Sequence, residues 1–198
     1  MNKDIRICFV GDSFVNGVGD KEKLGWSGRL CALSEKTNIE ITYYNLGIRR
    51  NTSSDICKRW RQECTCRLPQ GSENLIVFSF GVNDTVIENG KLRVSTEQSI
   101  NNAKKILIEA SKIYPVKMIG PPPIEDKIQN ERIREIDTSF LSLCEELSIP
   151  YLSVFEELKV NPIWLEEVSS NDGAHPRSKG YSALARLVES WEFWNLSS

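Results

Sequence analysis

The chain has 198 residues, a length that fits one compact domain, so we expect a single domain over residues 1–198. About 40% of the residues are hydrophobic and 26% are charged, the usual balance of a globular protein with a sizeable core, which argues against a disordered chain or a coiled coil. The formal net charge of −2 provides no broad positive field for a polyanion, so nucleic acid is a poor candidate as a partner.

The early part of the sequence contains no segment suited to membrane insertion. Its longest apolar run, residues 5–10, is interrupted by Arg6 and is too short for a signal peptide or a membrane span. We therefore expect a cytoplasmic protein with no membrane span, although a chain whose leader had been removed would look the same. The six cysteines lack the paired spacing of a zinc site, and we interpret the closest pair, Cys64 and Cys66, as two thiols near a helix end.

Short apolar runs alternate along the chain with longer segments of helical period. The runs at residues 5–10, 39–45, 74–80, 116–120 and 151–154 are rich in β-branched or aromatic residues and predict five strands. Helices are predicted over residues 25–36, 53–66, 96–113, 130–147 and 178–191. This alternation predicts the α/β class, with a small doubly wound parallel sheet that binds its ligands at the carboxyl ends of the strands.

The helix over residues 96–113 has the clearest pattern. Ser95 or Thr96 can cap its start, and Pro115 stands just beyond its end. Its apolar stripe consists of Ile100, Ala103, Ile106, Leu107 and Ala110. Such a stripe is expected to pack into the core.

The turn after the first strand carries a candidate nucleophile. Gly11, Asp12 and Ser13 follow the strand directly, and Gly17 and Gly19 come shortly after them, so the turn would hold Ser13 at the rim of the sheet. A serine hydroxyl is a weak nucleophile by itself and needs a base within hydrogen-bond reach, together with a third group that orients the base. The alternative is that Ser13 merely caps the first helix.

His175 is the only histidine in the sequence, so it is the candidate base. It stands just before the last predicted helix, and Asp172 precedes it by three positions with the small Gly173 and Ala174 between them. This spacing lets the Asp172 carboxylate reach Nδ1 of the imidazole, which leaves Nε2 free to accept the serine proton. The alternative is a loop or capping histidine without a catalytic role.

Two further loops offer hydrogen-bond donors for the negative charge that develops on a carbonyl oxygen during acyl transfer. Gly47 follows the second strand and can present its backbone N–H, and Asn83 follows the third strand and can present its side-chain amide. With the backbone N–H of Ser13 they would form an oxyanion hole of three donors. Asp84 is expected to brace its loop and not to react.

Together these residues resemble the four blocks of the GDSL or SGNH hydrolases, which carry in order a serine, a glycine, an asparagine and a histidine. The matching segments are Gly11-Asp12-Ser13 with Gly17 and Gly19, Asn45-Leu46-Gly47, Gly81-Val82-Asn83-Asp84 and Asp172-Gly173-Ala174-His175. The resemblance implies a flavodoxin-like three-layer α/β/α sandwich with strand order 2-1-3-4-5. It also implies a serine esterase that cleaves small ester or thioester substrates through an acyl-enzyme, with no metal or organic cofactor.

The second block departs from the family pattern, because many members follow its glycine with a small Ser-Gly pair, whereas here Gly47 is followed by Ile48, Arg49 and Arg50. A guanidinium group matches a carboxylate or phosphate well, so we expect Arg49 or Arg50 to contact an anionic group of the substrate. Trp164, in the loop-like stretch 161–165, is a candidate for the wall of an acyl pocket. Tryptophan at helical spacing is nevertheless more often a core residue.

Two other functions are compatible with the same residues. One is a carbohydrate O-acetyl esterase or acetyltransferase, and the other is a non-catalytic ligand-binding module on the same fold. Nucleotide binding is disfavoured, since Gly17 and Gly19 do not complete a dinucleotide motif and no Walker lysine-serine pair is present.

Overall fold

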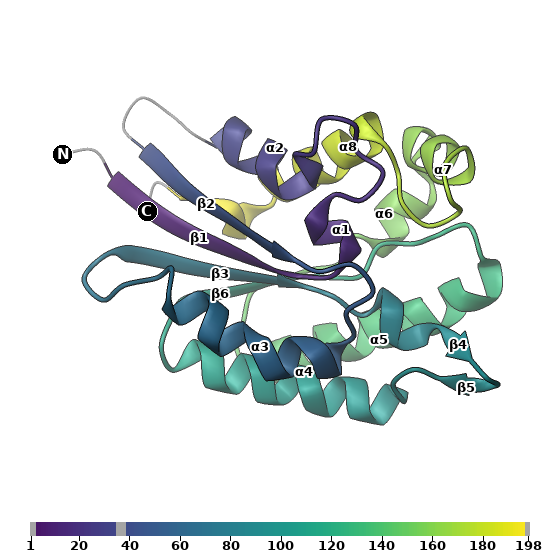
Figure 1. The fold of residues 1–198 in the computed structure, drawn as a ribbon, viewed down its shortest axis with the longest axis horizontal. Coiled ribbons are helices and arrows are strands. Elements are labelled where there is room, and N and C mark those ends of the chain that lie inside the picture. The colour runs from purple at the N-terminus through teal and green to yellow at the C-terminus, as the bar shows by residue number, and fades with distance from the viewer. Residues whose placement is uncertain (1–2, 35–38, 197–198) are drawn as a thin grey trace.

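The computed structural model describes residues 3–34 and 39–196, and a five-stranded parallel sheet forms its central layer (Figure 1). The strands lie in the order β2-β1-β3-β6-β7. Their bounds are Lys3–Gly11 for β1, Ile39–Gly47 for β2, Glu73–Ser79 for β3, Val116–Ile119 for β6 and Tyr151–Leu152 for β7. Because β6 and β7 are the fourth and fifth predicted strands, the predicted order 2-1-3-4-5 is confirmed.

Helices cover both faces of the sheet, which confirms the predicted three-layer sandwich (Figure 1). One face carries α1 (Ser13–Asn16), α2 (Gly25–Ser34), α6 (Phe155–Lys159), α7 (Pro162–Ser169), α8 (Ser178–Glu189) and the 3-10 turn η2 (Glu192–Trp194). The other face carries α3 (Ser53–Thr65), α4 (Thr96–Ser111) and α5 (Lys127–Glu146). Among the residues that the structure describes, no helix has both the length and the apolar character needed to cross a membrane.

Two short elements that the sequence patterns did not predict lie after β3. The 3-10 turn η1 (Val82–Thr85) follows the strand, and an antiparallel hairpin of β4 (Ile87–Glu88) and β5 (Lys91–Leu92) comes next. Elements of two to four residues are too short to produce a recognisable hydrophobic period. They matter for function because η1 carries Asn83.

Strand β1 is buried on both faces and separates two hydrophobic cores. Ile5, Ile7 and Phe9 pack into the core beneath α2 and α8, whereas Cys8 and Val10 pack into the core formed with α3, α4 and α5. A continuous apolar run of this kind is typical of a central strand in a parallel sheet. The turn that begins at the carboxyl end of β1 therefore rests on a rigid support.

The five predicted helices are present, with ends displaced by a few residues. Helix α4 begins after Ser95, whose hydroxyl accepts the Gln98 N–H at 3.2 Å, so Ser95 and not Thr96 is the cap. The members of its stripe that are fully buried are Ala103, Ile106, Leu107 and Ala110. Helix α2 is described as far as Ser34, and the predicted end at Lys36 lies outside the described residues.

Residues 161–165 were predicted as a loop, and this prediction is wrong because helix α7 begins there. Asn161 Oδ1 accepts the backbone N–H groups of Ile163 and Trp164, each at 3.0 Å, and Pro162 occupies the first helical position. Proline is well suited to that position because its φ angle is preset and its missing N–H would have no helical partner. The helix has 8 residues, which is too short to establish a recognisable hydrophobic period.

Candidate active site

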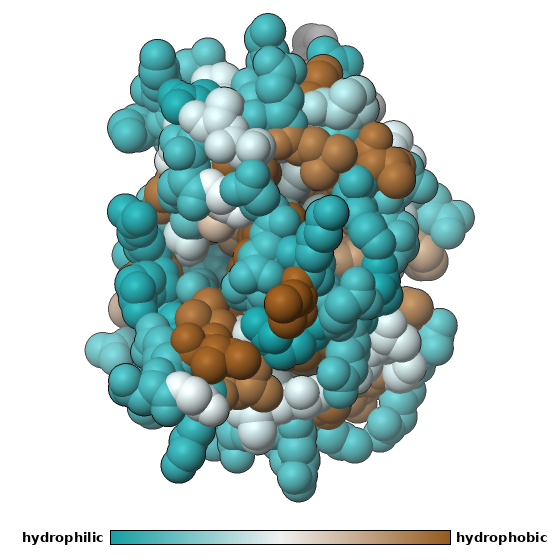
Figure 2. All heavy atoms as spheres, turned by 90° about the vertical axis from the view of Figure 1, so that its right-hand side faces the viewer, coloured by the Kyte–Doolittle hydropathy of each residue, from teal (hydrophilic) through white to brown (hydrophobic). Residues whose placement is uncertain are grey.

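The carboxyl ends of the strands point to the right in Figure 1, and Figure 2 views the molecule from that side. This face is mainly hydrophilic, with hydrophobic side chains gathered in separate patches. Exposed apolar residues of the segments at this edge are Ile48, Ile87, Ile128, Ile163 and Leu165. The candidate catalytic residues lie at the same edge, at the ends of β1 and β3 and in the segment between α7 and α8.

The nucleophile candidate Ser13 is the first residue of the short helix α1, immediately after β1. Asp12 caps the helix, since its Oδ1 accepts the Phe14 N–H at 2.9 Å, and Gly17 ends it with a φ angle of 83°. The strand, the cap and the left-handed glycine together form a tight turn that holds the Ser13 side chain in one place. Ser13 is only 3% exposed, so its hydroxyl lies largely in protein surroundings.

The segment before α8 brings His175 to Ser13, although the two residues are 162 positions apart. Nε2 of His175 lies 2.8 Å from Ser13 Oγ, and Nδ1 lies 2.8 Å from Asp172 Oδ2. Oδ1 of Asp172 accepts the backbone N–H groups of His175 at 2.8 Å and Ala174 at 3.1 Å. The structure thus brings the three residues predicted to be catalytic into one continuous chain of contacts.

Asp172 remains a carboxylate in this arrangement. Partial burial would raise its pKa, but hydrogen bonds from the backbone and imidazole of His175 outweigh that effect and hold the pKa of Asp172 below its usual value. An ionised carboxylate can accept only, so the proton of this contact resides on Nδ1. Nε2 is then the basic nitrogen, and it faces the Ser13 hydroxyl.

Asn83 lies in η1, directly after β3, and its side chain reaches the nucleophile turn. Its Nδ2 donates to Asp12 Oδ2 at 3.2 Å. A side-chain amide carries two N–H donors, so the second remains for a substrate oxygen. The backbone N–H of Ser13 stands at the first position of α1, where it has no partner within the helix. Ser13 and Asn83 therefore offer donors from neighbouring strand ends.

Gly47 has a different role from the predicted one. Its N–H donates to Asn45 Oδ1 at 2.9 Å, and the Asn45 amide is itself held by Val15 O at 2.8 Å and by the Tyr43 hydroxyl at 2.9 Å. A backbone N–H has a single hydrogen, so the Gly47 N–H is already used in its bond to Asn45. A Cβ at Gly47 would lie 2.2 Å from the backbone N of Asn16. Glycine is required there because β2 packs against α1, and the arrangement does not support a Gly47 oxyanion donor.

The two arginines after Gly47 are separated by the structure. Arg50 has a left-handed φ angle of 68° and pairs with Glu88 of the β4–β5 hairpin, while Arg93 donates to the Arg50 carbonyl at 2.9 Å. Arg50 thus anchors the hairpin to the loop after β2. Arg49 is exposed, and it makes no ion pair within residues 3–34 and 39–196. Both side chains are exposed, and Arg49 is the one of the two whose charge is not already paired with a carboxylate.

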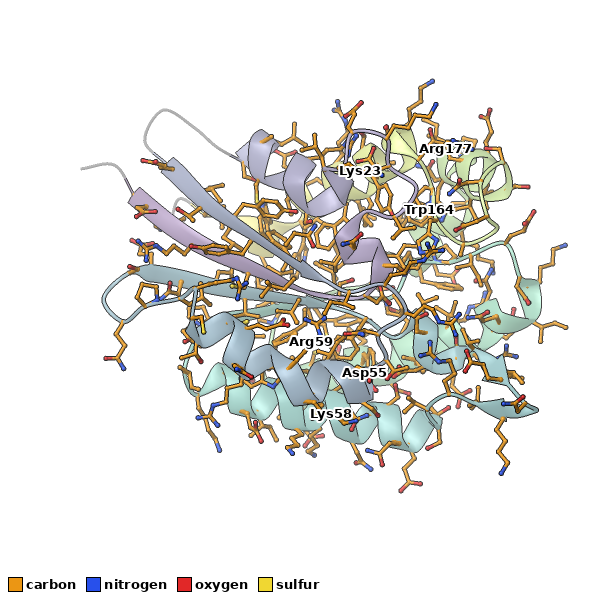
Figure 3. All side chains as sticks on the ribbon, viewed as in Figure 1. Lys23, Asp55, Lys58, Arg59, Trp164 and Arg177 are labelled. Carbon is orange, nitrogen blue, oxygen red and sulfur yellow. The ribbon has the colours of Figure 1, made fainter. Side chains whose placement is uncertain are left out.

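Trp164 does not line the surface. It is fully buried on the inner side of α7, and its Nε1 donates to Pro123 O at 3.0 Å (Figure 3). Its ring stacks on Phe14 with a centroid separation of 6.4 Å, and the Phe14 ring lies 4.8 Å from that of His175. Trp164 therefore supports the imidazole from the core through Phe14, and the prediction that it contacts substrate is wrong.

The structure also brings Arg59, which no sequence pattern indicated, to the neighbourhood of the site. Arg59 of α3 donates to Gly11 O at 2.8 Å and to Asn51 Oδ1 at 2.7 Å, so it joins the end of β1 to the loop after β2 (Figure 3). Asp84 accepts the Ser53 N–H at 2.8 Å and the Ser99 hydroxyl, and it braces η1 against α3 and α4 as predicted. No sequence pattern marks Arg59, because its acceptors are backbone and amide oxygens on other elements.

Asp12 is a buried titratable group directly before the nucleophile in the chain, and it was predicted only as part of a motif. Burial raises the pKa of Asp12 to about 7, and the neighbouring Asp84 adds to the increase, while the hydrogen bonds from Phe14 and Asn83 oppose it. Its two oxygens serve different neighbours, the Phe14 N–H and the Asn83 amide. One carboxyl group thus links the nucleophile turn to the candidate oxyanion donor.

Comparisons with known proteins agree with this geometry. The family model described as GDSL-like lipase/acylhydrolase matches residues 9–183. Similar solved structures include a lipase/acylhydrolase from Enterococcus faecalis, with a TM-score of 0.76, 21% identity and coverage of 96% of this chain and 94% of that one. Another is an acetylxylan esterase from Geobacillus stearothermophilus, with a TM-score of 0.74, 16% identity and coverage of 96% of both chains.

Curated protein sequences give no match to the chain. The solved structures share the fold at low sequence identity, whereas the family model spans most of the sequence, including the segments that carry Ser13, Asn83 and His175. The chain belongs to the GDSL-like lipase/acylhydrolase family and is a serine hydrolase of that ester-cleaving class.

Proposed function

We propose that the chain is a serine esterase in which Ser13, His175 and Asp172 act as a catalytic triad. The observation that carries this proposal is the unbroken series of contacts from Ser13 Oγ to His175 Nε2 at 2.8 Å and from His175 Nδ1 to Asp172 Oδ2 at 2.8 Å. A hydroxyl bonded to an imidazole that is oriented by a carboxylate is the arrangement that nucleophilic acyl transfer requires.

In the first half of the reaction Ser13 Oγ attacks the acyl carbon while its proton passes to Nε2 of His175. The carbonyl π electrons move onto the oxygen, and Asp172 stabilises the imidazolium that forms. The imidazolium then protonates the leaving alcohol or thiol as its bond to carbon breaks, which leaves an acyl-enzyme on Ser13. In the second half a water molecule gives its proton to Nε2, attacks the acyl carbon and releases the acid, and Ser13 recovers its proton.

We assign the stabilisation of the oxyanion to the Ser13 N–H and to the second Nδ2 hydrogen of Asn83. Both donors come from segments that begin at the carboxyl ends of adjacent strands, β1 and β3. Donors fixed before the reaction are effective because they need no reorganisation when the charge develops. The Gly47 N–H is left out because Asn45 already accepts its hydrogen.

A fluorophosphonate probe tests the triad directly. We expect the probe to add one phosphonyl group to the wild-type protein, located on Ser13 by peptide mass spectrometry, and to leave Ser13→Ala unlabelled and without esterase activity. Ser27→Ala is a matched control, because Ser27 is another buried serine that bonds only to Tyr43 and Val15. The proposal fails if Ser13→Ala keeps its activity. It also fails in favour of a non-catalytic binding module if the wild type is neither labelled nor active.

A carbohydrate O-acetyl ester is a second candidate substrate, and two observations favour it. The face around the site is mainly hydrophilic (Figure 2), which suits a polar alcohol better than a lipid surface. One structure with the same fold is an acetylxylan esterase. A panel of acetyl, butyryl and octanoyl esters and acetyl thioesters decides the acyl length, and acetylated sugars offered with and without a free sugar acceptor separate hydrolysis from acetyl transfer.

Arg49 is our candidate for a substrate-binding residue. Both arginines are exposed, but the charge of Arg50 is paired with Glu88, whereas Arg49 makes no ion pair among the described residues. We expect Arg49→Ala to raise KM for esters that carry a carboxylate or phosphate and to leave neutral esters of the same size unaffected. Arg50→Ala is the matched control and should not discriminate between the two esters. An equal effect of Arg49→Ala on both esters would refute this assignment.

A further inference from the structure

A second, partly buried junction joins the two catalytic segments, apart from the contact of Ser13 with His175. Asp20 lies in the loop between α1 and α2 and is fully buried. Its Oδ1 accepts the hydroxyl of Ser178 at 2.7 Å. Ser178 is the first residue of α8 and follows His175 by three positions. The Asp20–Ser178 bond therefore connects the chain just after the nucleophile helix to the chain just after the histidine.

Asp20 is held firmly on the nucleophile side of this junction. The guanidinium of Arg29 donates to both of its oxygens, at 2.5 and 3.2 Å, and the backbone N–H groups of Gly25 and Leu24 donate at 2.9 and 3.1 Å. Burial alone would raise its pKa, but the bonds from Arg29 and Ser178 outweigh burial and keep the pKa of Asp20 well below the usual value. Asp20 is thus a fixed, ionised acceptor toward which α8 is oriented.

Two more contacts hold the loop after α1 against the start of α8. The Tyr181 hydroxyl, one turn into α8, donates to Val18 O at 2.8 Å. Gly19 has a φ angle of 90°, and a Cβ at this position would lie 2.5 Å from Pro176 O. Residues 18–20 and 176–181 therefore pack with backbone in contact, so the histidine segment lies directly on the loop that follows Ser13.

The chemistry of an acyl-enzyme explains why such a junction is needed. When Ser13 Oγ carries an acyl group it has no hydrogen, so its hydrogen bond to Nε2 of His175 is lost for half of each cycle. The imidazole must nevertheless stay in place to activate water. The Asp172 carboxylate cannot provide this fixed point, because it belongs to the same segment as His175 and its bond to the imidazole does not tie that segment to Ser13.

We propose that Asp20 and Ser178 are positioning residues that set the distance between His175 Nε2 and Ser13 Oγ throughout the cycle. This inference rests on the proposed function of Ser13 and His175. It assigns the alignment of the catalytic groups to a hydrogen bond that touches neither the substrate nor the reacting atoms. Small displacements at such a site are costly, since a misplacement of about 1 Å can reduce the rate by about 100-fold.

The test compares three variants within the first two turns of α8. Ser178→Ala removes the hydroxyl that reaches Asp20, and Ser178→Thr keeps a hydroxyl there. Ser182→Ala is the matched control, because its hydroxyl donates only to Ser178 O within the helix. We expect Ser178→Ala to lower kcat and the rate of fluorophosphonate labelling by about tenfold, with KM changed less than about twofold. Ser178→Thr should recover most of the loss, and Ser182→Ala should match the wild type.

NMR of the imidazole separates misalignment from local unfolding. The chain has one histidine, so its signals need no assignment. In Ser178→Ala the nitrogen and carbon shifts should still report a hydrogen on Nδ1, because Asp172 accompanies His175. Tyr181→Phe, which removes only the hydroxyl that reaches Val18, is a second variant if Ser178→Ala does not fold, and its kcat should fall in the same way.

The possible outcomes distinguish this proposal from the proposed function. Labelling of the wild type at Ser13 together with a tenfold loss in Ser178→Ala and recovery in Ser178→Thr supports both. Labelling of the wild type with equal kcat in Ser178→Ala and Ser182→Ala overturns the positioning role and leaves the triad intact. Loss of the Nδ1–H signature in Ser178→Ala also overturns it, because the loss of activity would then come from unfolding. An unlabelled and inactive wild type overturns both.

Discussion

The two sides of the candidate site are built in different ways. On the histidine side, side chains from opposite ends of the chain meet in a series of short hydrogen bonds, and a buried carboxylate at Asp20 holds the segments together. On the oxyanion side, some of the candidate donors are already engaged: the Gly47 N–H bonds to Asn45, and one of the two hydrogens of the Asn83 amide bonds to Asp12. The histidine side can be recognised from residue types alone. The oxyanion donors can be identified only from the structure, because a donor is available to the substrate only if its hydrogen is not already bonded to another protein atom.

The histidine side should respond most strongly to substitution. We expect His175→Gln to lower kcat by at least about 10⁴-fold, because no other histidine can replace the base and a serine hydroxyl is unreactive without one. Steady-state hydrolysis of a small acetyl ester measures the effect, and circular dichroism verifies that the variant is folded. A loss of less than about tenfold would mean that Ser13 and His175 are neighbours without being partners in catalysis.

The oxyanion side should show a smaller but clear effect at Asn83. We expect Asn83→Ala to lower kcat by about 10²- to 10³-fold with little change in KM, because the amide acts on charge that is present only in the transition state. Asn83→Asp keeps the size of the side chain but removes both N–H donors, so it should be at least as inactive. If Asn83→Ala instead raises KM and keeps kcat, the residue binds the ground state of the substrate and is not an oxyanion donor.

Asp12 links the two sides, and its substitution should separate activity from stability. We expect Asp12→Asn to lower kcat by about tenfold, because an amide nitrogen cannot accept the hydrogen bond that orients Asn83. Above neutral pH we expect the same substitution to increase the free energy of unfolding. The folded pKa of Asp12 is about 7 and the unfolded value is 3.8, so between these values the folded protein retains a proton that the unfolded chain has released.

The free energy of unfolding contributed by Asp12 therefore falls as the pH rises from about 4 to about 7 and is level above that. Asp12→Asn has no such proton to lose, so it should unfold at a higher urea concentration than the wild type at pH 8 and show a flatter dependence on pH. Urea denaturation at pH 5, 6, 7 and 8 measures both curves. Parallel curves would mean that Asp12 is not a buried, titrating group.

The smallest effect on turnover is expected at Asn45. Asn45→Ala releases the Gly47 N–H, but it also removes bonds to Val15 O and the Tyr43 hydroxyl, so we expect the free energy of unfolding to fall by about 1–3 kcal/mol. Turnover by the folded enzyme should stay within about threefold of the wild type. A tenfold gain in kcat would mean that the Gly47 N–H stabilises the oxyanion once Asn45 no longer accepts its hydrogen. The proposed difference between the histidine side and the oxyanion side would then be wrong.

Much of the architecture could be read from the sequence. The five strands and five of the helices were predicted because their apolar runs are long enough to establish a period, and the strand order followed from the family resemblance. Helix α7 was missed because its 8 residues are too few to establish a hydrophobic period. The hairpin β4–β5 was missed because four paired residues carry no periodic signal.

The sequence alone determined which groups could perform the chemistry: a single histidine leaves one candidate base, and a carboxylate three positions earlier leaves one natural orienter. Tertiary structure decided which of the other candidates are available. Trp164 is directed into the core, Arg50 forms an ion pair with Glu88, and Gly47 lets β2 pack against α1. The physical reason is that the reactivity of a side chain is a property of its type, whereas the availability of a donor or a charge depends on the partners that folding places around it.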